Sequence, residues 1–237
     1  MHRDSTEAFA VSEYIRSVDV GRTRRGILFI VLGILISAVP ILSPIGEVIA
    51  LTGVVWFALG RNPFGERHSN YATIATAVFV LGIAFGLVGS IAYLLFALSL
   101  PGHGGTFFDL WQGNPLFTSA LDSSLQSILA TEATGAILTG IAYALFTYCL
   151  QRNVGRTMPV VGLTTSLITS VVVFSLLSSD VSPELLSAFS RGSYEPDFAY
   201  AFENQVLIVS LLNLIPTVIY GAAYRLAYSR LSNGELP

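Results

Sequence analysis

Few residues in this sequence have the types and spacing that catalysis or metal binding requires. The three histidines, His2, His68 and His103, are far apart in the chain, unlike the closely spaced ligands of a zinc site. The H-E-x-x-H, G-x-S-x-G and P-loop motifs do not occur. With one cysteine, Cys149, the sequence offers neither an intrachain disulfide nor a cysteine metal cluster. We therefore expect no enzymatic activity, no cofactor and no metal ion.

One carboxylate, Glu132, lies in a long apolar stretch. Ionisable side chains inside the hydrocarbon zone of a membrane are costly, so Glu132 is a candidate functional residue if it lies there. The preceding segment, SSLQSILAT, is partly polar, and Glu132 can therefore also sit at the outer interface. The sequence leaves both interpretations open.

A row of polar residues runs along the last apolar stretch, 204–228. They recur at intervals of three and four, so a helix would carry them on one face, which is typical of a side that packs against protein. We expect Asn213 to form a hydrogen bond inside the bundle, to the hydroxyl-rich stretch 158–178. Pro216 removes a backbone hydrogen bond, which predicts a kink. The candidate polar membrane face comprises Glu132, Thr139, Thr165, Thr169, Ser210, Asn213, Thr217 and Tyr220.

The composition indicates the class of protein that must position these residues. The chain has 237 residues, of which 53% are hydrophobic and 11% charged, whereas soluble domains carry about 25% charged residues. The first apolar stretch, 26–60, is too long for one membrane helix and is broken by PILSPIGE at 40–47. The sequence predicts an all-α, polytopic membrane protein with six transmembrane helices at about 24–42, 44–60, 71–98, 127–150, 158–178 and 204–228.

The arginines predict the orientation of this arrangement. All 12 basic residues are arginines, and only Arg191 falls on the opposite side from the other eleven. Positive residues mark the cytoplasmic side, which predicts an N-in, C-in topology. Glu47 and the loop 179–203 belong to the acidic outer side. The predicted parts are a cytoplasmic amphipathic segment 1–23, whose helix ends at Gly21, a membrane domain 24–230 and a cytoplasmic tail 231–237.

Small residues predict close helix packing in the third span. Gly82, Gly86 and Ser90 are spaced four residues apart, and such a strip lets two helix backbones approach each other. We therefore interpret these three residues as helix-packing positions.

The first third of the chain resembles a known family. The resemblance rests on the hairpin RRGILFIVLGILISAVPILSPIGEVIALTGVVWFALG, the polar loop RNPFGERHSN and the helix ATIATAVFVLGIAFGLVGSIAYLLF. It covers about residues 22–96, and the family is an uncharacterised group of archaeal multi-pass membrane proteins classed as a domain of unknown function. The resemblance implies residence in a membrane and supplies no catalytic residues.

These observations predict a multi-pass protein of the plasma membrane with a non-enzymatic structural or interaction role. Its partners are the lipid bilayer and either other proteins or further copies of itself, and not nucleic acid. The alternative is a small transporter or channel that uses the polar face between the fourth, fifth and sixth spans. A polar cavity between these helices would favour transport, and a dry, packed seam would favour the structural role.

Overall fold

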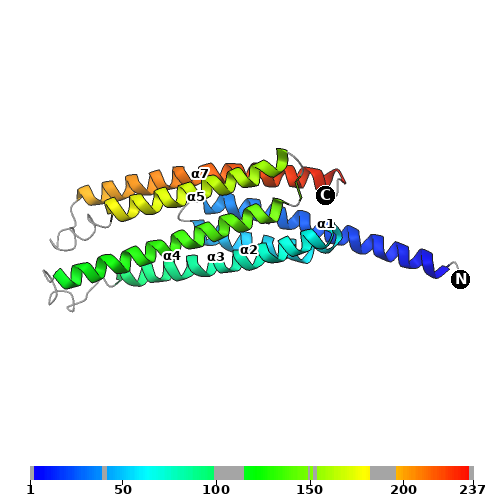
Figure 1. Cartoon of the computed structure of the whole chain (residues 1–237), viewed down its shortest axis with the longest axis horizontal. Coiled ribbons are helices and arrows are strands. Elements are labelled where there is room, and N and C mark those ends of the chain that lie inside the picture. The colour runs from blue at the N-terminus through cyan, green and yellow to red at the C-terminus, as the bar shows by residue number, and fades with distance from the viewer. Residues whose placement is uncertain are drawn as a thin grey trace. The chain divides into compact units, whose positions relative to one another are not determined.

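The computed structural model describes residues 3–38, 42–98, 115–148, 150–151, 154–181 and 196–234. In these ranges the chain is helical, without a strand, which confirms the all-α prediction (Figure 1). Two short elements, the 3₁₀ turn η2 (Asn62–Phe64) and the π-helical turn η3 (Leu177–Val181), accompany the long helices. The long helices are α1 (Arg3–Ser37), α2 (Ser43–Leu59), α3 (Glu66–Leu98), α4 (Pro115–Tyr148), α5 (Val154–Leu176) and α7 (Pro196–Ser232).

Four helices in the described part of the chain are long and apolar enough to cross a membrane, which confirms the membrane class of the protein. A fifth apolar helix, Ile45–Leu59 in α2, is shorter. The 17 residues of α2 span about 26 Å at a rise of about 1.5 Å per residue, less than a hydrocarbon core of about 30 Å. The six predicted spans are therefore not all found. The four candidate spans are Glu66–Gly89, Ser123–Tyr148, Gly155–Ser179 and Leu207–Ser232.

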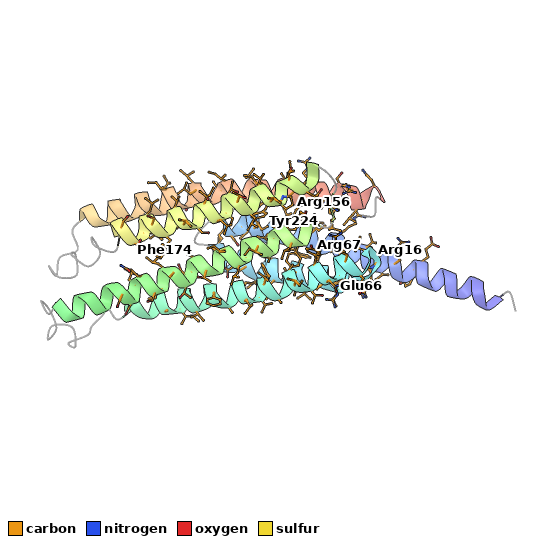
Figure 2. The ribbon with its side chains drawn as sticks, viewed as in Figure 1. Arg16, Glu66, Arg67, Arg156, Phe174 and Tyr224 are labelled. Atoms are coloured by element: carbon orange, nitrogen blue, oxygen red, sulfur yellow. The ribbon has the colours of Figure 1, made fainter. Side chains whose placement is uncertain are left out.

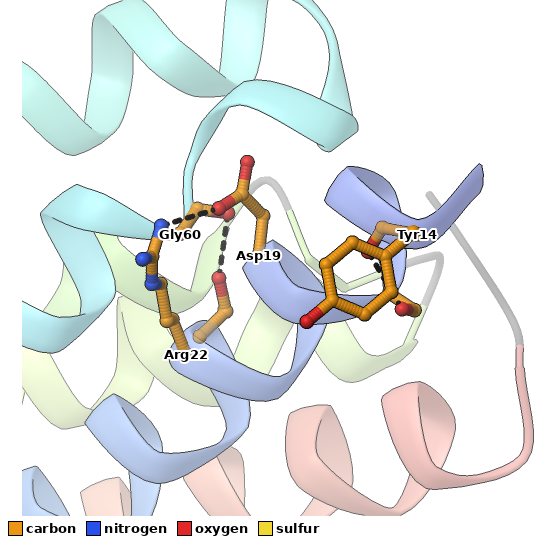
Figure 3. Close-up of polar contacts among 6 residues, drawn as sticks. Tyr14, Asp19, Arg22 and Gly60 are labelled. Carbon is orange, nitrogen blue, oxygen red and sulfur yellow. Dashed lines mark hydrogen bonds and ion pairs between the residues drawn. The ribbon is translucent and has the colours of Figure 1, made fainter. Parts of the chain in front are cut away.

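The predicted end of the first helix at Gly21 is wrong, because α1 continues through this residue to Ser37. Arg22 donates to Asp19 across one helical turn, with 2.9 Å between the nitrogen and the oxygen. Thr23 donates to the carbonyl oxygen of Gly60 at 2.8 Å (Figure 3). These contacts on both sides of Gly21 hold the helix together and offset the helix-breaking tendency of glycine, which is about 1 kcal/mol.

Four other helices begin earlier than the sequence predicted, α3 and α5 by five and four residues and α4 and α7 by more. α4 begins at Pro115 and α7 begins at Pro196, ahead of the expected starts near 127 and 204. Proline suits the first position of a helix, because the N–H that it lacks would have no partner inside the helix there. The N-terminal extensions of α4 and α7 contain polar residues, and a prediction based on apolar runs therefore did not include them.

The chain divides into two units. The first unit contains Met1–Val80, Gly140–Thr165 and Leu214–Pro237, and the second contains Leu81–Thr139 and Ser166–Asn213. α1 and α2 belong entirely to the first unit, whereas α3, α4, α5 and α7 contribute a segment to each.

In the first unit, α1 and α2 form a hairpin whose backbones touch. A Cβ atom on Gly26 would lie 2.7 Å from the carbonyl oxygen of Gly53, and one on Gly33 would lie 2.6 Å from that of Gly46. No side chain larger than hydrogen fits at these distances, so glycine is required. Each helix presents its glycines seven residues apart, which is two helical turns and keeps them on one face.

The second unit contains a looser version of the same contact, between α3 and α4. A Cβ atom on Gly135 would lie 2.8 Å from the backbone nitrogen of Gly86, and one on Gly82 would lie 2.6 Å from Oγ1 of Thr139. Gly82 and Gly86 thus lie at a helix contact, while the side chain of Ser90 lies outside the described residues. An apolar cluster of Leu125, Ile128, Leu129, Ala92, Phe174 and Leu177 completes this unit.

Candidate functional site

Three tyrosines form the polar centre of the first unit. We call Tyr143 on α4 with Tyr220 and Tyr224 on α7 the tyrosine cluster; the ring of Tyr143 lies 5.7 Å and 6.4 Å from those of the other two. Tyr220 donates its hydroxyl to the carbonyl oxygen of Gly140 at 2.8 Å, and Tyr224 donates to that of Tyr143 at 3.1 Å. A helical carbonyl has a second lone pair available, so both bonds join α7 to α4 without opening either helix.

Two further helices close around the tyrosine cluster. The ring of Phe79 on α3 lies 5.6 Å from that of Tyr143. On α5, a Cβ atom at Gly162 would lie 2.9 Å from the ring of Tyr220, so this glycine makes room for the aromatic side chain. Tyr220 and Tyr224 are both buried, and Figure 2 shows Tyr224 among the packed side chains. The result is a close-packed seam.

A carboxylate approaches this seam from α2. Glu47 is half-buried and interacts electrostatically with Tyr143. Glu47 lies one helical turn after Ser43, where α2 begins, and its assignment to the outer acidic side stays a prediction.

Hydrogen bonds fix the chain at the C-terminal end of α4. Gln151 is buried and donates its Nε2 to the carbonyl oxygen of Ala223 on α7 at 2.7 Å. Arg230 donates to the carbonyl oxygen of Leu150 at 2.7 Å, and Arg156 donates its Nε to that of Gln151 at 2.9 Å. Leu150 and Gln151 lie just beyond α4, which ends at Tyr148, and the two arginines serve as donors to their carbonyl groups.

Arginine–aromatic pairs surround the same end of the first unit. The guanidinium carbon of Arg24 lies 5.2 Å from the ring centre of Tyr228, and that of Arg25 lies 5.8 Å from Trp56. Arg156 lies 5.5 Å from the ring of Tyr148. Such cation–π contacts suit a membrane interface, where the ring remains in the apolar region and the charge reaches water. Figure 2 shows Arg16, Arg67 and Arg156 at this end.

His68 is buried between the rings of Phe57 and Phe64, at centroid distances of 5.6 Å and 5.0 Å. Neither of its ring nitrogens has a hydrogen-bond partner. Among the described residues, no three His, Cys, Asp or Glu side chains are grouped to hold a metal ion. His68 lies within the candidate span Glu66–Gly89, rather than outside the spans as the sequence suggested.

The residues of the predicted polar face are divided between the two units. Thr217 and Tyr220 are buried in the first unit. Glu132 and Thr139 instead contact Gly89 and Gly82 of α3 in the second unit, because residues seven apart share a helical face and this face of α4 meets α3. Of the remaining members, Thr169 is buried, Ser210 is half-buried, and Thr165 donates to the carbonyls of Val161 and Gly162 on its own helix.

Asn213 is exposed and has an interaction partner, and the predicted hydrogen bond from Asn213 to α5 stays a prediction. The polar row separates at this point: Thr217, Tyr220 and Tyr224 are buried, while Asn213 falls at the boundary of the second unit. The hydrogen bonds of Tyr220 and Tyr224 go to α4, and α5 contacts the row through Gly162. α7 is a continuous helix through Pro216, and the predicted kink there stays a prediction.

Three residues of the seam escaped the sequence analysis. Tyr143 and Gln151 carry no distinctive spacing of their own, because their partners are on α7, more than 70 residues away in the chain. Glu47 did carry a signal: it is the single charged residue between Arg25 and Arg61. The glycines also gave a signal, because they recur every seven residues within each arm of the hairpin, at 26 and 33 and at 46, 53 and 60.

No family model, curated protein or solved structure matches this chain.

Proposed function

We propose that this protein is a non-enzymatic, multi-pass protein of the plasma membrane with a structural or interaction role. The observation that supports the proposal is the seam between α4 and α7, in which the buried hydroxyls of Tyr220 and Tyr224 bond to backbone carbonyls. Polar groups that are satisfied in this way serve to hold helices together. The seam is packed with aromatic rings, as the structural interpretation requires.

The proposed topology places both termini in the cytoplasm. Eleven of the 12 arginines belong to the first unit, and those paired with Tyr148, Trp56 and Tyr228 match the basic and aromatic residues of a cytoplasmic interface. Four spans return the chain to the side on which it began. The hairpin of α1 and α2 does not alter this result, because its two ends lie on the same side.

The outer surfaces of the helices supply the interaction surface in this proposal. Ile168 and Val171 on α5 are 59% and 62% exposed, and Leu211 and Val218 on α7 are 56% and 63% exposed. In a membrane these side chains contact lipid, another protein or a second copy of the chain. Apolar side chains are neutral toward lipid, so partner binding depends on shape and packing.

A photo-cross-linking experiment in native membranes tests the interaction role. A photoreactive amino acid replaces Val171, and a matched control variant carries it at Ala142, which is fully buried. We expect a discrete protein adduct, from a partner or a second copy, at position 171 and none at position 142. Lipid adducts alone at position 171, and equally at Ile168, Leu211 and Val218, would contradict the interaction role.

Transport is the second candidate function, and it is favoured by the half-buried Glu47 on α2, the one charged side chain in residues 26–60. A carboxylate inside a helix bundle is a typical feature of ion pathways. Proteoliposomes loaded with a pH-sensitive dye measure proton flux across the membrane in the presence of a potential. Flux that the wild type supports and Glu47→Gln abolishes would replace the structural role with transport; equal, background flux in both would leave the structural role.

A further inference from the structure

Arg24 on α1 carries a positive charge that its neighbours do not neutralise. Its side chain is half-buried, and its guanidinium carbon lies 5.2 Å from the ring centre of Tyr228 on α7. Nη2 of Arg24 donates to the hydroxyl of Tyr228 at 3.3 Å, whereas the Nε atom is shielded from solvent and has no acceptor. No carboxylate pairs with Arg24 in the part of the chain that the structure describes. A guanidinium that is partly withdrawn from water and lacks a counter-charge attracts an anion.

The groups beside Arg24 are donors that suit a phosphate. The hydroxyl of Tyr228 accepts from Arg24 and keeps its own proton, so it can donate to a phosphate oxygen. Arg225 lies one helical turn from Tyr228 on α7, and its exposed side chain adds a second positive charge on the neighbouring surface. Acidic residues, which would repel an anion, do not occur in the sequence between 20 and 37 or between 204 and 232. Guanidinium groups bind phosphate oxygens through two parallel hydrogen bonds.

These residues lie at the level where a membrane has its lipid headgroups. The apolar stretch 26–60 begins two residues after Arg24. On the other helix, Tyr228 lies four residues before the end of the candidate span Leu207–Ser232. Arginine and aromatic side chains are enriched at this level of a membrane, where the phosphate groups of the lipids are also found.

An exposed row of leucines leads from Arg24 along α1 into the membrane. We call Leu28, Leu32 and Leu35 the leucine row; all three are exposed, and they follow Arg24 at intervals of four, four and three residues. Residues at these intervals share one helical face. From Arg24 to the last leucine the helix rises about 16.5 Å, which is close to half of a hydrocarbon core of about 30 Å. One acyl chain of a phospholipid extends over this depth.

α7 leaves open space on the face that carries Tyr228. Gly221 lies seven residues before Tyr228, which is two helical turns, so the two residues share a face. Nothing lies within 4 Å of the Cβ position of Gly221. A ligand that is held at Tyr228 therefore meets no side chain at this position on α7.

We infer that Arg24, Tyr228 and Arg225 bind the phosphate group of an anionic phospholipid, and that an acyl chain of this lipid lies along the leucine row. The leucine row favours a lipid over a free phosphate ion, because an acyl chain contacts it and an ion does not. The missing counter-charge of Arg24 favours an anionic lipid over a zwitterionic one, whose ammonium group offsets its phosphate. The proposed interaction role does not require this site, so the inference goes beyond that role.

Native mass spectrometry of the full-length protein tests the lipid site. The protein is released from micelles that contain equal amounts of phosphatidylglycerol and phosphatidylcholine. We expect the wild type to retain one phosphatidylglycerol in preference to phosphatidylcholine. Arg24→Gln should weaken this binding about tenfold, because hydrogen bonds to a charged group are lost. Arg24→Lys should retain part of the affinity, since it keeps the charge and loses the planar donor group.

The matched control is Arg16→Gln, which removes the same charge from an exposed position on α1, two helical turns before Arg24. This variant should bind the lipid as the wild type does. An equal loss in Arg16→Gln and Arg24→Gln would mean that the overall positive charge attracts the lipid, and it would overturn the inference. Equal retention of the two lipids by the wild type, or displacement of phosphatidylglycerol by an equal concentration of inorganic phosphate, would overturn it as well.

Photo-cross-linking of the wild-type protein tests the same site without a variant whose folding is in question. Liposomes contain phosphatidylglycerol with a photoreactive group in one acyl chain, and trypsin releases the peptide 26–61, which includes the leucine row. We expect adducts within residues 28–35, and an excess of unlabelled phosphatidylglycerol should suppress them whereas phosphatidylcholine should not. Adducts that both lipids suppress equally, or the absence of adducts from residues 28–35, would contradict the inference.

Discussion

The first unit joins its helices through backbone contacts and directional hydrogen bonds, whereas the second joins them through glycine contacts between α3 and α4 and an apolar cluster. In the first, Gly26 and Gly33 touch α2, and two tyrosines bond to α4 carbonyls. In the second, Gly135 touches Gly86, and Leu125 packs with Phe174. The relative positions of the helices in the first unit are therefore fixed by specific pairs of atoms.

The two units also differ in charge. The first unit contains eleven arginines and seven acidic residues, a net charge of +4, and the second contains one arginine and eight acidic residues, a net charge of −7. Arginines in the first unit contact carbonyl groups and aromatic rings. The helices of the first unit are therefore also joined by its arginines, and each prediction below tests part of this comparison.

The largest expected effect concerns whether the hairpin crosses the membrane. In a Cys149→Ser background, Leu42→Cys places a thiol at the exposed residue next to the start of α2. Because the turn should lie inside the membrane, we expect no reaction with a bulky, membrane-impermeant maleimide added from either side. Ser232→Cys is the control that should react from the cytoplasmic side alone. Reaction of position 42 from outside would restore the six-span arrangement.

The next largest effect concerns the backbone contact of the hairpin. In Gly53→Ala the new Cβ would lie 2.6 Å from the backbone nitrogen of Ile30, so α1 and α2 must separate. Overpacking of this kind costs about 1–3 kcal/mol, and we expect the upper part of that range in SDS unfolding of the protein in mixed micelles. Gly221→Ala is the matched control, since nothing lies within 4 Å of its Cβ position. Equal stability of the two variants would contradict the role of backbone contacts in joining these helices.

Gly135→Ala sharpens the comparison in the second unit. Its Cβ would lie 2.8 Å from the nitrogen of Gly86, slightly further than in the hairpin. The three nearest atoms are backbone atoms of α3 at 2.8, 2.9 and 3.2 Å, against 2.6, 2.7 and 2.8 Å for the three atoms nearest the Cβ position of Gly53. Because less displacement relieves the longer contacts, we expect a loss of about 1–2 kcal/mol in the same assay. A loss larger than that of Gly53→Ala would reverse the ranking of the two units.

Much of the fold follows from the sequence, for identifiable reasons. The apolar runs predicted the membrane helices, and the three–four spacing placed Thr217 and Tyr220 on one buried face. The same spacing could not reveal which helix covers that face, and it failed for Asn213, where the cover ends. Glu47 and Tyr143 meet only through packing of helices distant in the chain, which local periodicity does not contain. The prediction that the first helix ends at Gly21 was wrong because the hydrogen bonds of Arg22 and Thr23 offset the helix-breaking tendency of this glycine.

A smaller effect is expected for the tyrosine cluster. Tyr224→Phe keeps the ring contacts with Tyr143 and removes the hydroxyl that bonds to its carbonyl oxygen at 3.1 Å. Side-chain hydrogen bonds between membrane helices contribute about 0.6 kcal/mol on average and up to about 1.7. We expect a loss of about 1 kcal/mol in SDS unfolding. Tyr71→Phe is the control, since the ring of Tyr71 stacks on that of Tyr148, outside the tyrosine cluster.

The smallest effect should come from Asn213→Leu. Asn213 is exposed, so its amide competes for partners with the surroundings of the helix, whereas Tyr220, two turns further along α7, is buried. A leucine is favourable in contact with lipid by about 0.3–0.6 kcal/mol per residue. This gain offsets the loss of the polar interaction, and we expect a net change in unfolding free energy within about 0.5 kcal/mol. A loss approaching that of Tyr224→Phe would mean that the directional bonding of the first unit extends past its boundary into the second.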